Sequence, residues 1–388
     1  MKFSERSEAL AGQEMFQILQ RAQDLQREGR SILHFELGDP DFDTPPHITE
    51  SLVNAVSKGF THYSPSTGLP ELKEAAINAM MRGRRRFAPK LSQVLVTAGA
   101  NIQLYFAMAC TLDIGDEVII PDPGFVSYYS VAKYLGIKIR RLKIDEKNSF
   151  RPTPADVRNC ITPRTRMIIL NSPSNPLGAV MTEQEIRGIY DLAKEYDLWV
   201  LSDEVYTRYI YDNKAYSFFS GSMIDHCEER TILVNGFSKS FAMTGWRLGI
   251  LTAPEELTRR MGLLLETIMS CTPTFIQRAA ISALREKTDV VKEMVKEYEI
   301  RRDIVLEGLA KIPNISCVPP DGAFYAFPNI TKTGMDSRQF CDHMLEEAGV
   351  ALAPGPVFGE NGEGYFRLAY CTSREDLTTG LERMRNVL

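Results

Sequence analysis

Short apolar runs recur along the middle of this 388-residue chain, and each is separated from the next by sequence long enough for a helix. Between about residues 50 and 250, the runs occupy positions 94–96, 117–120, 167–170, 199–201 and 231–234. Gly, Pro, Asp or Asn bounds each run, as is typical of buried strands in parallel sheets. The alternation predicts an α/β fold with a mostly parallel sheet covered by helices on both faces. Because such sheets bind ligands at the carboxyl ends of their strands, we expect functional side chains directly after each run.

The flanking segments predict a second, smaller domain. A polar amphipathic pattern before this region is typical of a helix and ends at Gly29. After the region, a long helical pattern is broken at Pro273, and α+β patterns complete the chain. The predicted flanking helices are at about 13–28, 254–311, 337–348 and 374–387, and the strands at 323–327 and 365–370. We therefore expect an N-terminal arm and part of the small domain at 1–48, a large domain at 49–285 and a small C-terminal domain at 286–388.

Composition and charge exclude several classes of protein. The net charge is −5, which does not indicate a positively charged surface for nucleic acid. We interpret the basic cluster at 82–86 as a solvated helix end. No apolar run approaches the roughly 20 residues that span a bilayer, and the N-terminus does not resemble a signal peptide. The 7 cysteines are scattered without a C-x-x-C pair, so they indicate reduced thiols. We expect a cytoplasmic protein with no membrane and no nucleic-acid partner.

The segment 236–249, which reads GFSKSFAMTGWRLG, contains the most informative pair of side chains. Lys239 lies among small residues, and Arg247 follows eight positions later. A lysine amine can condense with an aldehyde to form an imine, and a guanidinium can bind phosphate oxygens through two donors. Pyridoxal 5'-phosphate carries both groups. A lysine–arginine pair alone is usually a pair of solvated surface charges.

At every position, this segment resembles the lysine-attachment signature of the class I and II aminotransferases. The resemblance extends over nearly the whole chain, particularly to the bacterial aspartate-aminotransferase-like branch. It implies the fold type I of pyridoxal-phosphate-dependent enzymes, in which a large α/β domain is joined to a smaller α+β domain. It also implies that Lys239 forms the imine with the cofactor and, once displaced by the substrate amine, acts as the general base.

The resemblance assigns the phosphate site to the turn after the first apolar run and to the lysine segment. Gly99, Ala100 and Asn101 open a helix there, and a helix N-terminus favours a phosphate. Arg247 is expected to bind the same phosphate. Relatives often have a serine three positions before the lysine, where this chain has glycine, so the site is one donor short or uses Ser238 instead.

Residues after three further runs are assigned to the cofactor ring. Phe125 is expected to stack on the ring, where many relatives have Trp or Tyr. Asn175 and Tyr206 are expected to donate to the phenolic oxygen, although Leu177 replaces the usual Thr of the asparagine turn. Asp203 is expected to keep the pyridine nitrogen protonated, which makes the ring an electron sink.

Three other assignments concern the substrate and the partner subunit. Arg367 matches the arginine that binds the substrate α-carboxylate, and Gly38 and Asn175 are expected to line the same subsite. Tyr63 lies in a segment that reaches the neighbouring subunit's cofactor phosphate in such enzymes, which implies a homodimer with shared active sites. Each residue alone would have an ordinary structural explanation. The assignment rests on their occurrence in family order, after successive apolar runs.

The expected reaction moves an amino group from an L-amino acid to a 2-oxo acid. Elimination, cyclisation or decarboxylation of a modified amino acid on the same fold remains the alternative. Ligand-sensing domains of transcription regulators also resemble this family, but the chain has no room for a DNA-binding domain before Gly38. No Lys or Arg occurs at 97–123 or 268–277. With the apolar side chains of Tyr105, Phe106 and Met108, this argues against an acidic substrate side chain.

Overall fold

The computed structural model describes residues 2–4, 7, 12, 14–81, 88–212, 219–285 and 290–388. The basic cluster at 82–86 lies outside the described residues. Within the part of the chain that is described, no helix is long and apolar enough to cross a membrane.

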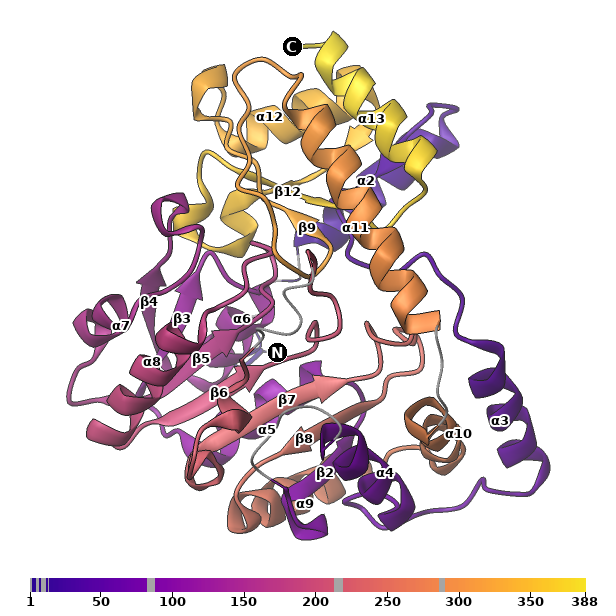
Figure 1. The fold of residues 1–388 in the computed structure, drawn as a ribbon, viewed down its shortest axis with the longest axis vertical. Helices are drawn as coiled ribbons and strands as arrows, with labels where there is room; N and C mark the ends of the chain where they lie inside the picture. The colour runs from indigo at the N-terminus through magenta and orange to yellow at the C-terminus, as the bar shows by residue number, and fades with distance from the viewer. Residues whose placement is uncertain are drawn as a thin grey trace.

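Seven strands form the central sheet, in the order β2-β8-β7-β6-β5-β3-β4 (Figure 1). Their bounds are Val94–Thr97 (β2), Glu117–Asp122 (β3), Lys138–Lys143 (β4), Thr165–Asn171 (β5), Trp199–Asp203 (β6), Thr231–Gly236 (β7) and Gly249–Thr252 (β8). Only β8 runs antiparallel to its neighbours. The predicted mostly parallel sheet is confirmed, and each apolar run lies in a strand. The edge strand β4 was not predicted, because its sequence, KIRRLK, is mostly charged and forms no apolar run.

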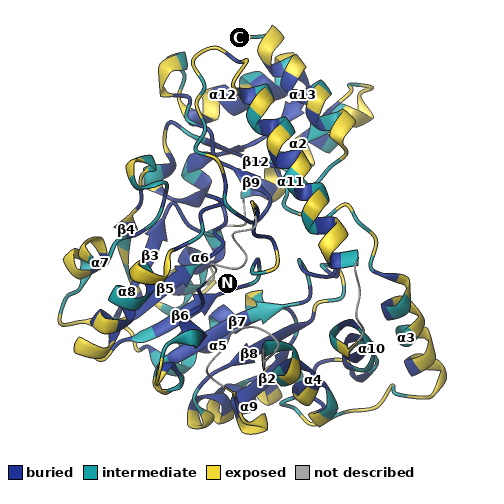
Figure 2. Cartoon of the chain, in the orientation of Figure 1, coloured by how far each residue is buried: buried dark blue, intermediate teal, exposed yellow. Residues whose placement is uncertain are grey.

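Successive side chains of the central strands pack on opposite faces of the sheet, as strand geometry requires. In β5, Met167 and Ile169 join an apolar cluster with one set of helices. Ile168 and Leu170 join another cluster on the other face. The first set comprises α5 (Asn101–Thr111), α6 (Val126–Leu135) and α9 (Glu255–Met269), and the second α7 (Pro154–Cys160) and α8 (Glu183–Glu195). Figure 2 shows the strands between these layers as mostly buried.

The C-terminal elements gather at one end of the molecule, at the top of Figure 1. β11, β12 and β9 form a three-stranded antiparallel sheet, which packs on aromatic side chains such as Phe324 and Tyr370. The elements are α11 (Val290–Leu309), β9 (Tyr325–Ala326), α12 (Ser337–His343), a π-helical turn (Met344–Ala348), β10 (Val350–Ala351), β11 (Ala353–Pro354), β12 (Phe366–Ala369) and α13 (Arg374–Asn386). The predicted smaller α+β region is confirmed.

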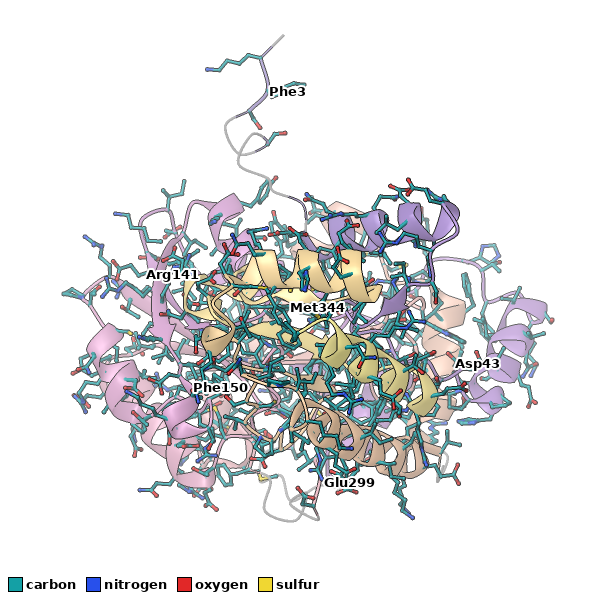
Figure 3. The ribbon with its side chains drawn as sticks, turned by 90° about the horizontal axis from the view of Figure 1, so that it is seen from above. Phe3, Asp43, Arg141, Phe150, Glu299 and Met344 are labelled. Carbon is teal, nitrogen blue, oxygen red and sulfur yellow. The ribbon has the colours of Figure 1, made fainter. Side chains whose placement is uncertain are left out.

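The N-terminal segment lies against these C-terminal elements. β1 (Leu33–His34) pairs in parallel with β10, and α2 (Glu14–Arg27) is joined to the region around α12 by ion pairs. One of these joins Arg21 to Asp342, with 2.6 Å between nitrogen and oxygen. Before α2, Phe3 projects away from the rest of the chain (Figure 3). The domain boundaries after residues 48 and 285 stay predictions.

Three further helices pack beside β2 at the other end of the molecule: α3 (Pro46–Ser57), α4 (Pro70–Met81) and α10 (Thr274–Arg285). The strand register then determines where the polar strand ends meet. Asn171 is the register partner of Asp203, and Gly236 is the partner of Gly249. The carboxyl ends of β5, β6 and β7 therefore meet at one edge of the central sheet, which faces the C-terminal elements.

Candidate active site

A cavity of about 450 Å³ opens at this edge of the sheet. Every residue that the sequence assigns to the site lines it, except Gly99 and Tyr63. The predicted residues that it brings together are Gly38, Ala100, Asn101, Phe125, Asn175, Asp203, Tyr206, Ser238, Lys239, Arg247 and Arg367. Because these residues come from widely separated segments, the sheet register and the packing of the C-terminal region place them around one space.

Lys239 lies in the loop between β7 and β8, and its amine reaches across the cavity to the N-terminal segment. Nζ donates a 2.6 Å hydrogen bond to the backbone oxygen of Gly38. Part of the side chain remains accessible from the cavity, but the amine itself is surrounded by protein atoms. This desolvation lowers the pKa of Lys239, and Arg367 and Arg247 lower it further against the opposing effects of Cys371 and Asp39. A larger fraction of the amine is therefore neutral than in a solvated lysine.

Asp203, the last residue of β6, is a buried carboxylate. Oδ2 accepts a 2.6 Å hydrogen bond from the hydroxyl of Tyr128, and Oδ1 accepts one of 3.3 Å from the backbone N–H of Val205. Burial raises the pKa of Asp203 to about 6, although both donors act in the opposite direction. The sequence analysis missed Tyr128, since a tyrosine within a helix gives no sign of a partner 75 positions later.

The turn after β2 and the Arg247 side chain lie together at one corner of the cavity. Ala100 and Asn101 begin α5, whose first backbone N–H groups have no partner within the helix. Gly99 has a φ of +83°, and a Cβ there would come within 2.5 Å of Nη2 of Arg247. The glycine is thus needed for the close approach of the guanidinium. Ser238 lines the cavity on the same loop as Lys239.

Arg367, on β12, is fully buried and points its guanidinium between the rings of Tyr325 and Phe358. Nη1 donates a 3.0 Å hydrogen bond to Oδ1 of Asn175, and Nη2 donates one of 2.5 Å to the backbone oxygen of Glu36. Nε is buried and has no partner. This guanidinium therefore has one N–H donor that no described protein atom accepts.

Tyr206 lines the cavity, as does Asn175, and its expected bond to the phenolic oxygen of the cofactor stays a prediction. In the chain alone, its hydroxyl lies 2.7 Å from the hydroxyl of Tyr325. A Cβ at Gly38 would come within 2.0 Å of that Tyr325 hydroxyl, so only glycine fits there. Tyr325 comes from β9, and no sequence pattern assigned it to the site.

Phe125 and Tyr63 have contrasting positions. Phe125 lies at the start of α6 and meets the ring of Tyr128 edge to face, with 5.6 Å between centroids. Phe125 also lines the cavity. Tyr63 is 87% exposed and lies outside the cavity of the single chain.

The apolar part of the cavity wall differs from the prediction. Tyr105, Phe106 and Met108 do not line the cavity, so the choice of these residues as its apolar wall was wrong. Phe106 and Met108 are fully buried in the core between the sheet and the helices. Leu104 of α5 lines it instead, together with Leu37 and two residues of α2, Met15 and Phe16. The amphipathic pattern of α2 predicted a helix but did not show that its first turn borders the site.

Comparison with known proteins agrees with this fold and constellation. Residues 30–384 match the family model described as aminotransferase class I and II. The chain is 42% identical to aromatic-amino-acid aminotransferase 2 of Thermococcus litoralis, over 100% of this chain and 98% of that protein. It is 43% identical to an aspartate aminotransferase of Pyrococcus horikoshii, over 92% and 90%. The solved structure of aspartate aminotransferase from Thermus thermophilus with maleate matches with a TM-score of 0.95 and 34% identity, over 100% of both chains.

A lysine, a carboxylate and two arginines thus border one cavity at the edge of a mostly parallel sheet, and the matched relatives with this fold are aminotransferases. The chain belongs to the class I and II aminotransferase family. It is an aminotransferase acting on amino acids and 2-oxo acids, in a family that depends on pyridoxal 5'-phosphate.

Proposed function

We propose that this chain binds pyridoxal 5'-phosphate in the cavity and transfers the amino group of an L-amino acid with an apolar, chiefly aromatic, side chain to a 2-oxo acid. One observation carries the proposal. A lysine amine of lowered pKa, a buried carboxylate and two guanidinium groups, those of Lys239, Asp203, Arg247 and Arg367, border a single cavity whose remaining wall is largely apolar.

The residues around the cavity fit this cofactor. Arg247 and the N-terminus of α5 offer donors for its phosphate, and Gly99 leaves the room that the guanidinium needs. Asp203 would face the ring nitrogen, and Phe125 would lie against the ring, with Asn175 and Tyr206 near the phenolic oxygen. When bound, the cofactor supplies a conjugated ring that accepts the electron pair released when the substrate Cα–H bond breaks.

Lys239 would have two roles. Its amine holds the cofactor before the substrate arrives, and once freed it takes the proton from the substrate Cα. The lowered pKa supports both roles, because only the neutral amine can act as nucleophile or base. The Gly38 oxygen, 2.6 Å from Nζ, orients the amine toward the cavity.

Arg367 would bind the substrate α-carboxylate and thereby orient the Cα–H bond. Its hydrogen bonds to Asn175 and to the Glu36 backbone fix the guanidinium plane, and the unpartnered Nε remains for the incoming anion. A buried, oriented arginine recognises a carboxylate through two parallel hydrogen bonds.

The preference for an apolar side chain rests on charge. Among the described residues that line the cavity, the lysine and arginine side chains are those of Lys239, Arg247 and Arg367, and each already has a role. An acidic substrate side chain would need a further cation, whereas Phe16, Leu37 and Leu104 offer apolar surface. The relatives' names include both aromatic-amino-acid and aspartate aminotransferases, so an acidic donor is the second candidate.

We also propose a homodimer with shared sites. Tyr63 is 87% exposed in the single chain, and a partner subunit would cover it. In the dimer it would reach the partner's cofactor phosphate.

Steady-state kinetics with 2-oxoglutarate as acceptor test the substrate assignment. We expect kcat/KM for L-phenylalanine and L-tyrosine to exceed that for L-aspartate by at least about tenfold. A preference for aspartate would contradict the apolar assignment and indicate a cation from the partner subunit. Release of ammonia without conversion of the 2-oxo acid would contradict transamination itself.

A further inference from the structure

The loop that carries both Lys239 and Arg247 has an unfavourable backbone. Ala242 has a φ of 50° and Arg247 a φ of 52°, both in the left-handed region that residues with a Cβ rarely adopt. Such conformations persist only where surrounding contacts stabilise them, and they cluster at functional sites. The contacts that hold this loop therefore determine the distance between the amine and the guanidinium.

One hydroxyl bonds to both halves of the loop. Oγ1 of Thr44 donates a 2.6 Å hydrogen bond to the backbone oxygen of Ala242, three residues after Lys239. The same atom accepts a 3.0 Å hydrogen bond from Nε1 of Trp246, the residue before Arg247. Thr44 thus joins Ala242, one of the two residues with positive φ, to Trp246, the neighbour of the other.

The segment that contains Thr44 is itself well anchored. Asp41 forms a 2.7 Å ion pair with Arg301 of α11, and Phe42 meets the ring of Tyr298 edge to face at 5.4 Å. Gly38, at the start of the segment, accepts the hydrogen bond from Lys239. Hydrogen bonds therefore join the loop of Lys239 and Arg247 to the segment from Gly38 to Thr44, and Gly38 lines the same cavity.

We propose that Thr44 is a positioning residue that holds Arg247 at the correct distance from Lys239, so that the cofactor is bound by its phosphate and its aldehyde at once. This rests on the proposed function. Thr44 acts mainly on the arginine end of the loop, because the lysine end has its own support. The hydroxyl of Tyr209 donates a 2.6 Å hydrogen bond to the backbone oxygen of Lys239.

The test compares two ligands that differ only in the phosphate. The full-length chain, freed of cofactor, is titrated with pyridoxal 5'-phosphate and with pyridoxal, and binding is followed by absorbance and protein fluorescence. Thr44→Val keeps the shape of the side chain but removes both hydrogen bonds. We expect it to raise the Kd for pyridoxal 5'-phosphate about tenfold and the Kd for pyridoxal by less than about twofold.

Two controls accompany this variant. Thr44→Ser restores the hydroxyl and is expected to bind both ligands within about twofold of the unmodified chain. Thr378→Val removes a hydrogen bond of the same kind in α13, outside the cavity. There the threonine hydroxyl donates to the backbone oxygen of Arg374 at 2.9 Å. It is expected to leave both Kd values unchanged.

Equal losses for the two ligands in Thr44→Val would overturn the proposal, because they would indicate a general structural role. Unchanged binding of pyridoxal 5'-phosphate would overturn it as well. If Thr44→Val does not fold, Trp246→Phe tests the proposal instead, because it removes only the hydrogen bond from Nε1 of Trp246 to the Thr44 hydroxyl. It should raise the Kd for pyridoxal 5'-phosphate about threefold and spare pyridoxal. Failure of the unmodified chain to bind pyridoxal 5'-phosphate would instead overturn the proposed function.

Discussion

The hydroxyl of Tyr128 donates a 2.6 Å hydrogen bond to Oδ2 of Asp203, and both side chains are buried. Burial raises the pKa of Tyr128 well above 10, so the phenol stays a donor throughout the physiological range. Burial also raises the pKa of Asp203 to about 6. The ionised form of Asp203 is therefore unfavourable in the chain alone, because it is desolvated. A cation next to it, such as a protonated ring nitrogen, would stabilise this form.

Replacing this carboxylate should stabilise the cofactor-free chain while impairing its function. The folded pKa of about 6 lies above the ordinary value of 3.8, so the group's stabilising contribution is complete below pH 3.8 and is lost as pH rises through 6. Asp203→Asn should therefore raise the free energy of unfolding above pH 6, by at most about 3 kcal/mol. Calorimetry at pH 5 and pH 8 should show a gain that grows with pH. A loss of stability of equal size at both pH values would contradict the explanation.

Lys239→Ala should abolish covalent attachment of the cofactor and lower kcat by about 10²–10⁴-fold or more, because both nucleophile and base are removed. Borohydride reduction followed by peptide mass mapping measures the attachment site. Near-normal turnover by a folded variant would refute the assignment.

Lys73 provides the matched control for this experiment. Burial lowers its pKa to about 8, but its amine donates to the hydroxyl of Thr67 at 2.9 Å and lies outside the cavity. Lys73→Met should retain full attachment, which would show that a lowered pKa alone does not select the lysine.

Arg367→Gln should lower kcat/KM for amino acids by about a hundredfold or more, mostly through KM, because a buried hydrogen-bonded charge is lost. The comparison substrate is 2-phenylethylamine, which lacks the α-carboxylate. Its rate, which we expect to be low in the unmodified enzyme, should change little in the variant. If the variant loses activity on both substrates equally, Arg367 does not recognise the carboxylate.

Tyr63→Phe should raise the Kd for pyridoxal 5'-phosphate about tenfold without dissociating the proposed dimer, since it removes only the hydroxyl that we propose to reach the partner's phosphate. Sedimentation velocity reports the oligomeric state, and titration of the cofactor-free chain reports the Kd. A fully active monomer would contradict the shared site.

Much of the fold was predictable because local patterns determine it. The apolar runs and the glycines and prolines around them predicted five strands of the central sheet, and Asp203 and Asn175 were found directly after two of these runs. β8 was missed because Gly249–Thr252 follows the lysine segment without a helix between them, so it does not repeat the alternation.

The parts of the site that the sequence did not reveal depend on contacts between distant segments. Met15 and Phe16 line the cavity because ion pairs hold α2 beside α12. Tyr325 contacts Tyr206 because the C-terminal sheet packs against the central sheet. Glu36 is a fully buried acid whose carboxylate bonds to His34 at 2.8 Å and raises the pKa of that histidine. No local pattern marks such side chains as part of a site.

We have proposed that Lys239 and the residues around the cavity transfer an amino group through a bound pyridoxal 5'-phosphate. The most direct test adds L-phenylalanine, with no 2-oxo acid present, to the purified chain loaded with this cofactor. We predict loss of the visible absorbance of the lysine-bound cofactor and formation of a stoichiometric amount of phenylpyruvate without free ammonia. Continued release of ammonia, or a chain that acquires no visible absorbance when the cofactor is supplied, would contradict the claim.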